Sequence, residues 1–180
     1  MKRDKSQSRP DHGTAGAGTR PGGELDVTQF LTALEPGARL IGIDVGTRTL
    51  GLALSDVTRT IASPLETIRR TKFAADAGRL AQLAGEHSVG GFVVGLPTNL
   101  DGSDGPRVQS TRAFVRNLAR VVPLPVLLWD ERLSTAAAER MLIEADASRR
   151  RRAEVIDKIA ATIILQTALD RMRSLSGPQL

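Results

Sequence analysis

Residues 39–55 of the chain read RLIGIDVGTRTLGLALS. Apolar positions alternate with small or polar ones on either side of Gly46, which predicts two strands, 39–45 and 49–55, joined by a tight hairpin. One acidic residue, Asp44, lies inside the first of these apolar strands. Burying a carboxylate is costly unless it binds a cation or accepts hydrogen bonds. We therefore expect Asp44 to bind a cation, with hydrogen bonds from the hairpin amides as the alternative.

The segments that follow predict a mixed sheet. A third extended segment directly follows the hairpin, whereas the two later ones are separated by helical patterns. Consecutive strands form an antiparallel meander, and strands separated by helices form crossovers in a parallel sheet. The expected strands span 39–45, 49–55, 60–68, 91–95 and 126–129, and the expected helices span 25–34, 72–87, 108–118, 134–145 and 153–172. This α/β order, with three antiparallel strands, then two parallel strands, and helices on both faces, is that of an RNase H-like domain.

Charge is distributed unevenly along the 180 residues. Of the formal net charge of +5, residues 1–23 contribute +3 and the run Arg149 to Arg152 contributes +4, which leaves −2 for the rest. Residues 1–23 are rich in Gly, Ser, Thr, Pro and Arg and bury too little apolar surface to offset their ordering entropy. We therefore expect a disordered basic tail over 1–23, followed by one ordered domain over 24–180. The basic regions suit a nucleic-acid partner without establishing one.

Two absences in the sequence limit the function classes. The chain has no cysteine, which excludes disulfides, thiolate metal sites and a cysteine nucleophile. No stretch approaches the roughly 20 consecutive apolar residues of a membrane-spanning helix, and no apolar region follows the basic start as it would in a secretory signal. We therefore expect no membrane partner, and oxygen ligands for any bound metal.

Two further acids lie where the predicted fold would bring them near Asp44. Glu131 follows the last predicted strand, at the carboxyl edge of the sheet where open α/β folds bind ligands. Because only one of two adjacent residues on a strand points into a site, we favour Glu131 over its neighbour Asp130. Asp157 precedes the apolar helical run 159–165. Both positions could instead hold acids that complement a helix dipole, but together the three acids form the donor set of two-metal phosphodiester hydrolysis with Mg²⁺ or Mn²⁺.

Several polar residues are candidates for binding a nucleic-acid backbone. The glycine-rich loop 95–107 precedes a helix whose first turn contains Pro106, and the amides of such a helix start suit a phosphate. A polar connection without a ligand is the alternative. The arginine run 149–152 either contacts phosphates or forms a solvated loop between two helices. The candidate set is Asn99, Ser103, Arg107, Arg132, Arg149, Arg150 and Arg151.

Four blocks of sequence together carry a family resemblance. They are GIDVGT at 42–47, VVGLP at 93–97, DERLST at 130–135 and DKIAA at 157–161. This ordered set resembles the YqgF family, also called RuvX, of RNase H-like bacterial nucleases. The resemblance covers about residues 40–170 of the chain. It implies a cytoplasmic, metal-dependent nuclease that matures the 5′ end of precursor 16S ribosomal RNA, with Holliday junction resolution as the alternative.

The resemblance also implies roles for individual residues. Asp44, Glu131 and Asp157 take the positions of the catalytic, metal-binding carboxylates, with two ions of Mg²⁺ or Mn²⁺. The strand 91–95 departs from the wider RNase H-like pattern because it is followed by Leu-Pro rather than ending in an acid, so Glu131 must supply the second carboxylate. The expected partners are precursor rRNA or branched DNA, together with ribosomal particles, for a monomer or a homodimer.

Two other interpretations fit parts of the sequence. The block 44–47 resembles the phosphate-binding hairpin of actin-like ATPases and sugar kinases, but those enzymes clamp a nucleotide between two such domains and this chain predicts one. A non-catalytic nucleic-acid-binding or assembly factor would keep the fold without turnover. The presence of all three acids argues against that second interpretation.

Overall fold

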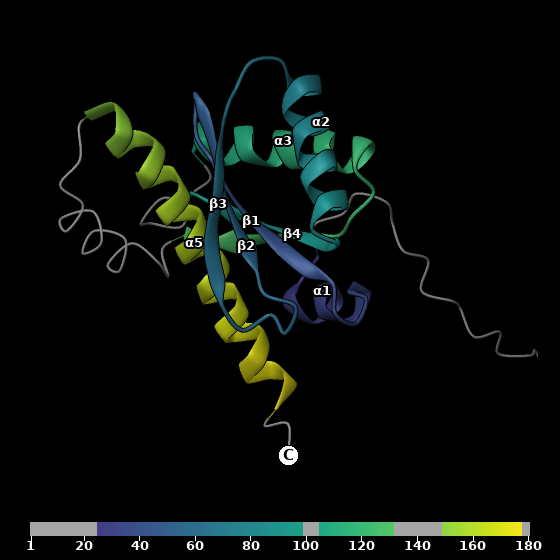
Figure 1. The fold of residues 1–180 in the computed structure, drawn as a ribbon. Coiled ribbons are helices and arrows are strands. Elements are labelled where there is room, and N and C mark those ends of the chain that lie inside the picture. The colour runs from purple at the N-terminus through teal and green to yellow at the C-terminus, as the bar shows by residue number, and fades with distance from the viewer. Residues whose placement is uncertain (1–24, 99–104, 132–148, 178–180) are drawn as a thin grey trace, which may run out of the picture.

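Five strands form one mixed sheet (Figure 1). The computed structural model describes residues 25–98, 105–131 and 149–177, and in the last range it describes side chains from residue 156 onward. The strands are β1 (Arg39–Val45), β2 (Thr49–Ser55), β3 (Ala62–Arg69), β4 (Val89–Leu96) and β5 (Val126–Asp130). Their order is β3-β2-β1-β4-β5, with antiparallel pairing from β3 to β1 and parallel pairing from β1 to β5. The expected fold class, that of an RNase H-like domain, is confirmed.

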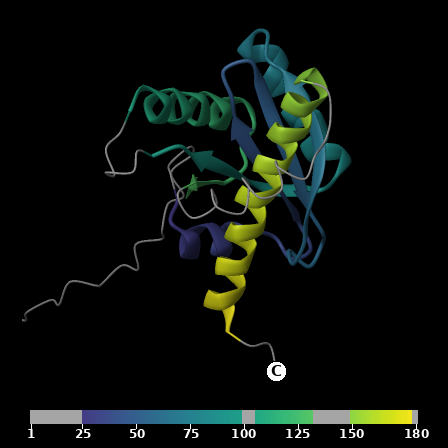
Figure 2. The ribbon, with the colours of Figure 1, turned by 90° about the vertical axis from the view of Figure 1, so that its left-hand side faces the viewer.

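Helices cover both faces of the sheet. They are α1 (Val27–Ala33), α2 (Phe73–Glu86), α3 (Pro106–Val121) and α5 (Arg149–Ser176). One core, which includes Ile41 and Leu52, lies under α2 and α3, whereas a second core, which includes Leu40 and Ala53, lies under α1 and α5. The two views show α5 crossing its face of the sheet diagonally (Figures 1 and 2). No helix in the described part of the chain combines the length and apolar character that crossing a membrane requires.

Glycines in the central strands let α5 approach the sheet closely. A Cβ atom at Gly42 would lie 2.7 Å from the Cβ of Leu165 and 2.8 Å from the carbonyl oxygen of Ala161. A Cβ atom at Gly51 would collide with the backbone carbonyl of Asp157. At both positions the added Cβ atom would come closer to its neighbours than real Cβ atoms do. These two strand positions therefore need glycine. The backbone of α5 therefore rests directly on β1 and β2.

A side chain of α5 also covers the outer edge of β3. The Oε1 atom of Gln166 accepts a hydrogen bond from the backbone N–H of Ala62 at 2.9 Å, and its Nε2 atom donates to the carbonyl of Thr60 at 3.0 Å. An edge strand presents unpaired backbone groups that would otherwise be open to another chain. Gln166 thus takes the place of a strand partner where β3 begins.

Several element bounds differ from the sequence-based expectations by a few residues, as at β4 (89–96 against 91–95) and α3 (106–121 against 108–118), and two differences have a clear physical reason. The third strand spans 62–69 rather than 60–68, because residues 56–61 form a hydrogen-bonded turn. The last helix begins at Arg149 rather than at 153, so the alternative of a solvated loop at the arginine run is wrong. Arginine has a high helix propensity, which lets a charged turn extend the helix beyond its apolar part. The predicted helix 134–145 and the predicted tail lie outside the described residues.

Asp56 organises the turn between β2 and β3. Its Oδ1 atom accepts the backbone N–H of Thr60 at 2.7 Å and that of Ile61 at 2.8 Å, and the Thr58 hydroxyl donates to the other carboxylate oxygen. Burial acts in the opposite direction, but these hydrogen bonds lower the pKa of Asp56 from 3.8 to about 2. The ionised carboxylate therefore stabilises the fold above about pH 4, and this contribution is lost as the pH falls through about 2.

We expect Asp56→Ala to lower the free energy of unfolding at neutral pH by about 1 kcal/mol, a modest value because solvent screens this turn. The difference between the two proteins should shrink between about pH 4 and pH 2, where the wild-type carboxylate becomes protonated. Urea unfolding at a series of pH values measures this difference. A difference that stays constant down to pH 2 would show that the charge of Asp56 does not stabilise the turn.

Candidate functional site

The alternation of side chains along the strands turns two of the expected acids toward α5. On β1, Val45 belongs to the core under α2 and α3, so its neighbour Asp44 faces the other helical layer. Trp129 on β5 packs in the core under α5, and Glu131, two residues later, faces the same way. The carboxylate of Glu131 lies over Gly95 of β4, where a Cβ atom would be 2.5 Å from Oε1. Because β4 lies between β1 and β5, Glu131 leans toward Asp44.

The third acid, Asp157, comes from α5. Gly51 is the partner of Asp44 in the β1–β2 register, and the α5 backbone rests on Gly51 at Asp157. The hydroxyl of Thr49 donates a hydrogen bond to Oδ2 of Asp157 at 2.7 Å. Asp157 is therefore held beside the hairpin and next to Asp44. It follows the first residue of α5 by eight positions, so the alternative of an early-turn acid that complements the helix dipole is wrong.

The neighbouring negative charges affect the ionisation of two of the acids, Asp44 and Glu131. Burial, together with the negative charge of Asp157, raises the pKa of Asp44 from 3.8 to about 6. Burial, together with the charges of Asp44 and Asp130, raises the pKa of Glu131 from 4.5 to about 7. Such shifts mean that the ionised forms are unfavourable here without a positive partner. Functional sites commonly contain acids perturbed in this way.

Arg107 supplies part of that positive charge. It lies in the first turn of α3, after Pro106 at the helix start, as the sequence predicts. Its charge lowers the pKa of both Asp44 and Glu131, which places the guanidinium near both carboxylates. The side chain is exposed to solvent. An exposed arginine at a helix N-terminus is well suited to contact a phosphate.

Asp130 has a different environment from Glu131. Its Oδ1 atom accepts a hydrogen bond from the Thr98 hydroxyl at 2.7 Å, just beyond the end of β4. Glu131 faces Asp44, which is the orientation that the sequence analysis favours. Sequence reasoning missed both Thr98 and Thr49, because a threonine beside a strand end carries no pattern that identifies a distant carboxylate as its partner.

The acids offer carboxylate oxygen, the donor that Mg²⁺ and Mn²⁺ prefer. In residues 25–98, 105–131 and 149–177, no three carboxylate or imidazole groups are close enough together to hold one ion. The electrostatic couplings instead join Glu131 to Asp44 and Asp44 to Asp157, so Asp44 lies between the other two. Two cations, each between a pair of acids that share Asp44, would fit this order and relieve the repulsion that raises the pKa values.

The structure brings together only part of the predicted backbone-binding set. Arg107 lies beside the acids, and Arg149 to Arg151 form the first turn of α5. For these three arginines the structure describes the backbone alone. Asn99, Ser103 and Arg132 lie outside the described residues. Their roles stay predictions.

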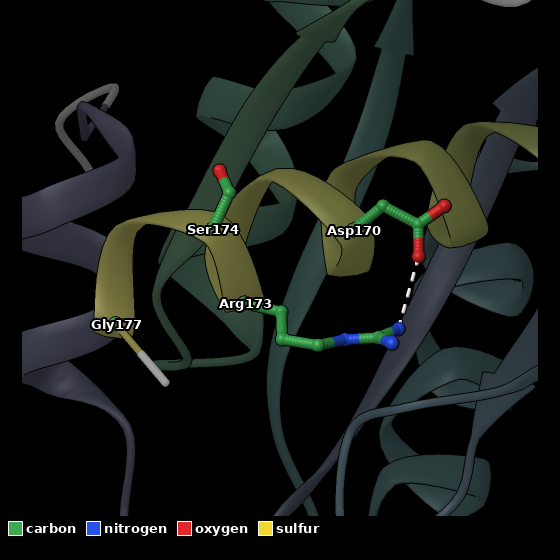
Figure 3. A pocket seen from close by; sticks show the side chains of 4 residues that line it. All are labelled: Asp170, Arg173, Ser174 and Gly177. Carbon is green, nitrogen blue, oxygen red and sulfur yellow. Dashed lines mark hydrogen bonds and ion pairs between the residues drawn. The ribbon is translucent and has the colours of Figure 1, made fainter. Parts of the chain in front are cut away.

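A shallow pocket at the far end of α5 is separate from the acids. It is lined by Asp170, Arg173, Ser174 and Gly177, and an ion pair of 3.0 Å joins the first two (Figure 3). Asp170 lies 13 residues after Asp157, a distance of about 20 Å along a helix axis. The pocket is therefore not part of the candidate site.

Comparison with known families places the chain among its relatives. Residues 38–171 match the model of the RuvX family, whose description is Holliday junction resolvase. The chain belongs to the RuvX family. The matched range contains Asp44, Glu131 and Asp157, as well as the strands and the part of α5 that position them.

Curated relatives of this RuvX protein resemble it over nearly their whole length. One from Cereibacter sphaeroides, named "Putative pre-16S rRNA nuclease", is 61% identical over 146 residues, which are 81% of this chain and 91% of the relative. A relative of the same name from Methylocella silvestris is 58% identical over 153 residues, or 85% and 95% of the two chains. Among solved structures, Thermus thermophilus RuvC in complex with a Holliday junction substrate is 16% identical, with a TM-score of 0.49 and coverage of 75% and 96%.

Proposed function

We propose that this RuvX protein is a nuclease that hydrolyses phosphodiester bonds in precursor 16S rRNA, using Mg²⁺ or Mn²⁺ held by Asp44, Glu131 and Asp157. The observation that supports this most strongly is the meeting of three acids from β1, the end of β5 and α5 on one face of the sheet. Burial and like charge raise the pKa of two of them. We take the substrate from the name "Putative pre-16S rRNA nuclease", which relatives 61% and 58% identical to this chain carry.

Each acid then has a defined task. Asp44 would help to hold both ions, because its charge couples to Glu131 on one side and to Asp157 on the other. Thr49 keeps the Asp157 carboxylate oriented, and the missing side chain at Gly95 leaves the space that the Glu131 carboxylate occupies. When bound, divalent ions supply Lewis-acid activation of the attacking water and neutralise the charge that develops on the leaving oxygen.

The substrate backbone approaches the acids from the side of α3. Arg107 offers a planar, two-pronged contact to a phosphate oxygen pair next to the site. Asn99, Ser103 and Arg132, together with Arg149 to Arg151, would extend this contact along the strand. The predicted basic tail, residues 1–23, would add affinity that does not depend on sequence. The proposed cleavage takes place in the cytoplasm, on precursor rRNA that is either free or assembled in ribosomal particles.

A second candidate function, Holliday junction resolution, rests on the description of the family model. Resolving a junction requires cuts in two strands, and therefore two sites presented by a homodimer with two-fold symmetry. Trimming one RNA end needs a single site and is possible for a monomer. We favour the RNA because curated relatives 61% and 58% identical to this chain carry that name.

The experiment that tests the proposal gives the purified protein two substrates, a precursor 16S rRNA with its 5′ extension and a four-way DNA junction. We expect cleavage of the RNA with Mg²⁺ or Mn²⁺, and none in the presence of a chelator. Cleavage that survives the chelator would contradict a metal-dependent reaction. Symmetrical cutting of the junction with the RNA left intact would instead favour the resolvase.

A further inference from the structure

Arg70 is the residue that directly follows β3, and it binds the β1–β2 hairpin through both its side chain and its backbone. Its Nη1 atom donates a hydrogen bond of 2.7 Å to the backbone carbonyl of Gly46. Its backbone N–H donates to the carbonyl of Arg48 at 2.9 Å. Two carbonyls of the hairpin turn are therefore held by one residue from the neighbouring strand.

The guanidinium of Arg70 also contacts α2 and α3, the two helices that cover this face of the sheet. Its Nε atom lies 3.8 Å from Oδ2 of Asp76, a buried acid in the first turn of α2. Its central carbon lies 5.7 Å from the centre of the Phe114 ring on α3. Phe114 packs edge-on against Phe73 of α2, with ring centres 5.9 Å apart. A planar cation engaged on three sides has few alternative rotamers, so it is a rigid link between the hairpin and the α2–α3 layer.

The hairpin that Arg70 holds touches two of the three acids. Asp44 precedes Gly46 by two residues on β1. On the other strand, the N–H of Gly46 donates to the carbonyl of Thr49 at 2.9 Å, and the Thr49 hydroxyl binds Asp157 at 2.7 Å. A shift of the hairpin turn would therefore displace Asp44 through the chain and Asp157 through Thr49.

We propose that Arg70 is a positioning residue for the acidic site, which acts by pinning the Gly46 carbonyl against α2 and α3 so that Asp44 and Asp157 keep their spacing. The proposal rests on the proposed nuclease function. The main alternative is that Arg70 contacts the nucleic acid itself. Its engagement with Gly46, Asp76 and the Phe114 ring argues for the positioning role.

The test compares Arg70→Lys with Arg79→Lys as the matched control. Arg79 forms a two-pronged ion pair with Glu66, at 2.7 and 2.9 Å, that joins α2 to β3. Each variant keeps a positive charge opposite its acid, so neither leaves a buried carboxylate uncompensated. A single ammonium at position 70 cannot reach Gly46 and Asp76 together as the guanidinium fork does. The double variant Arg70→Gln/Asp76→Asn removes both charges at once and serves as a second route if the lysine variant folds poorly.

We expect Arg70→Lys to lower the kcat for RNA cleavage by about tenfold or more with KM changed less than about twofold, since misplacing reacting groups by about 1 Å costs up to about 10²-fold. The double variant should behave in the same way. Hydrogen exchange at the Gly46 amide should become faster in both, because the turn is no longer pinned. Arg79→Lys should leave kcat, KM and the exchange rate at their wild-type values.

Two results would overturn the proposal. The first is an unchanged kcat, which together with a raised KM would make Arg70 a substrate contact. The second is a lower kcat without faster exchange at the Gly46 amide. If the wild-type protein cleaves neither substrate, the proposed function has failed on its own. The exchange measurement then still decides the proposal, with faster exchange supporting the link between Arg70 and the hairpin and unchanged exchange overturning it.

Discussion

Asp44→Asn is expected to lower the kcat for cleavage of precursor RNA by about 10³-fold while the protein stays folded. Metal-ion catalysis contributes several kcal/mol to the stabilisation of a transition state, and about 4 kcal/mol corresponds to that factor. Asp44 is the acid that couples to both others, so its loss affects both proposed ion positions. Without metal, the amide removes a buried charge that repels its neighbours, and the variant should be at least as stable as wild type.

Two measurements separate this effect from a general loss of structure. In metal-free protein, carboxyl NMR should show the pKa of Glu131 falling below its value of about 7, because one of the negative charges that raises it has gone. Asp170→Asn makes the same chemical change in the exposed ion pair at the far end of α5 and should leave cleavage unchanged. Undiminished cleavage by Asp44→Asn would contradict the assignment of Asp44 as a metal ligand.

Features that depend on neighbouring residues could be predicted from the sequence. The bounds of β1 and β2 agree with the expected ones because alternating apolar residues on both sides of one turn specify a hairpin locally. The same period of two predicts that only one of Asp130 and Glu131 faces the site, without deciding between them. The structure turns Glu131, the favoured residue, over Gly95 and toward Asp44. The start of α5 could not be predicted in this way, because a run of arginines has helix propensity but no apolar periodicity that marks a helix.

Features that depend on distant partners could not be predicted. Thr49 binds Asp157 across 108 positions of sequence, and Arg70 binds the Gly46 carbonyl across 24. Neither residue type nor spacing distinguishes these side chains from ordinary surface threonines and arginines. The acids themselves stand out because a carboxylate in an apolar setting is costly, whereas the groups that hold the acids in place carry no such signal.

Gly51→Ala is expected to lower the free energy of unfolding by about 3 kcal/mol, since a side chain here meets backbone that cannot rotate away. The added methyl group would collide with the carbonyl of Asp157, so α5 has to move off β2. That movement carries the Asp157 carboxylate away from Asp44, the partner of Gly51 in the strand register. We therefore also expect cleavage to fall by up to about 10²-fold, the loss that a shift of about 1 Å in a catalytic group can cause.

Gly78→Ala is the matched control, because a Cβ atom at this position of α2 has nothing within 4 Å. Alanine is favoured over glycine in a helix by about 0.5–1 kcal/mol, so the same substitution should stabilise the protein there and leave cleavage unchanged. Thermal unfolding and the RNA cleavage assay measure both variants. If Gly51→Ala were as stable and as active as wild type, α5 would not rest on β2 at this point. The spacing of Asp157 from Asp44 would then depend on the Thr49 hydroxyl rather than on the close approach of helix and sheet.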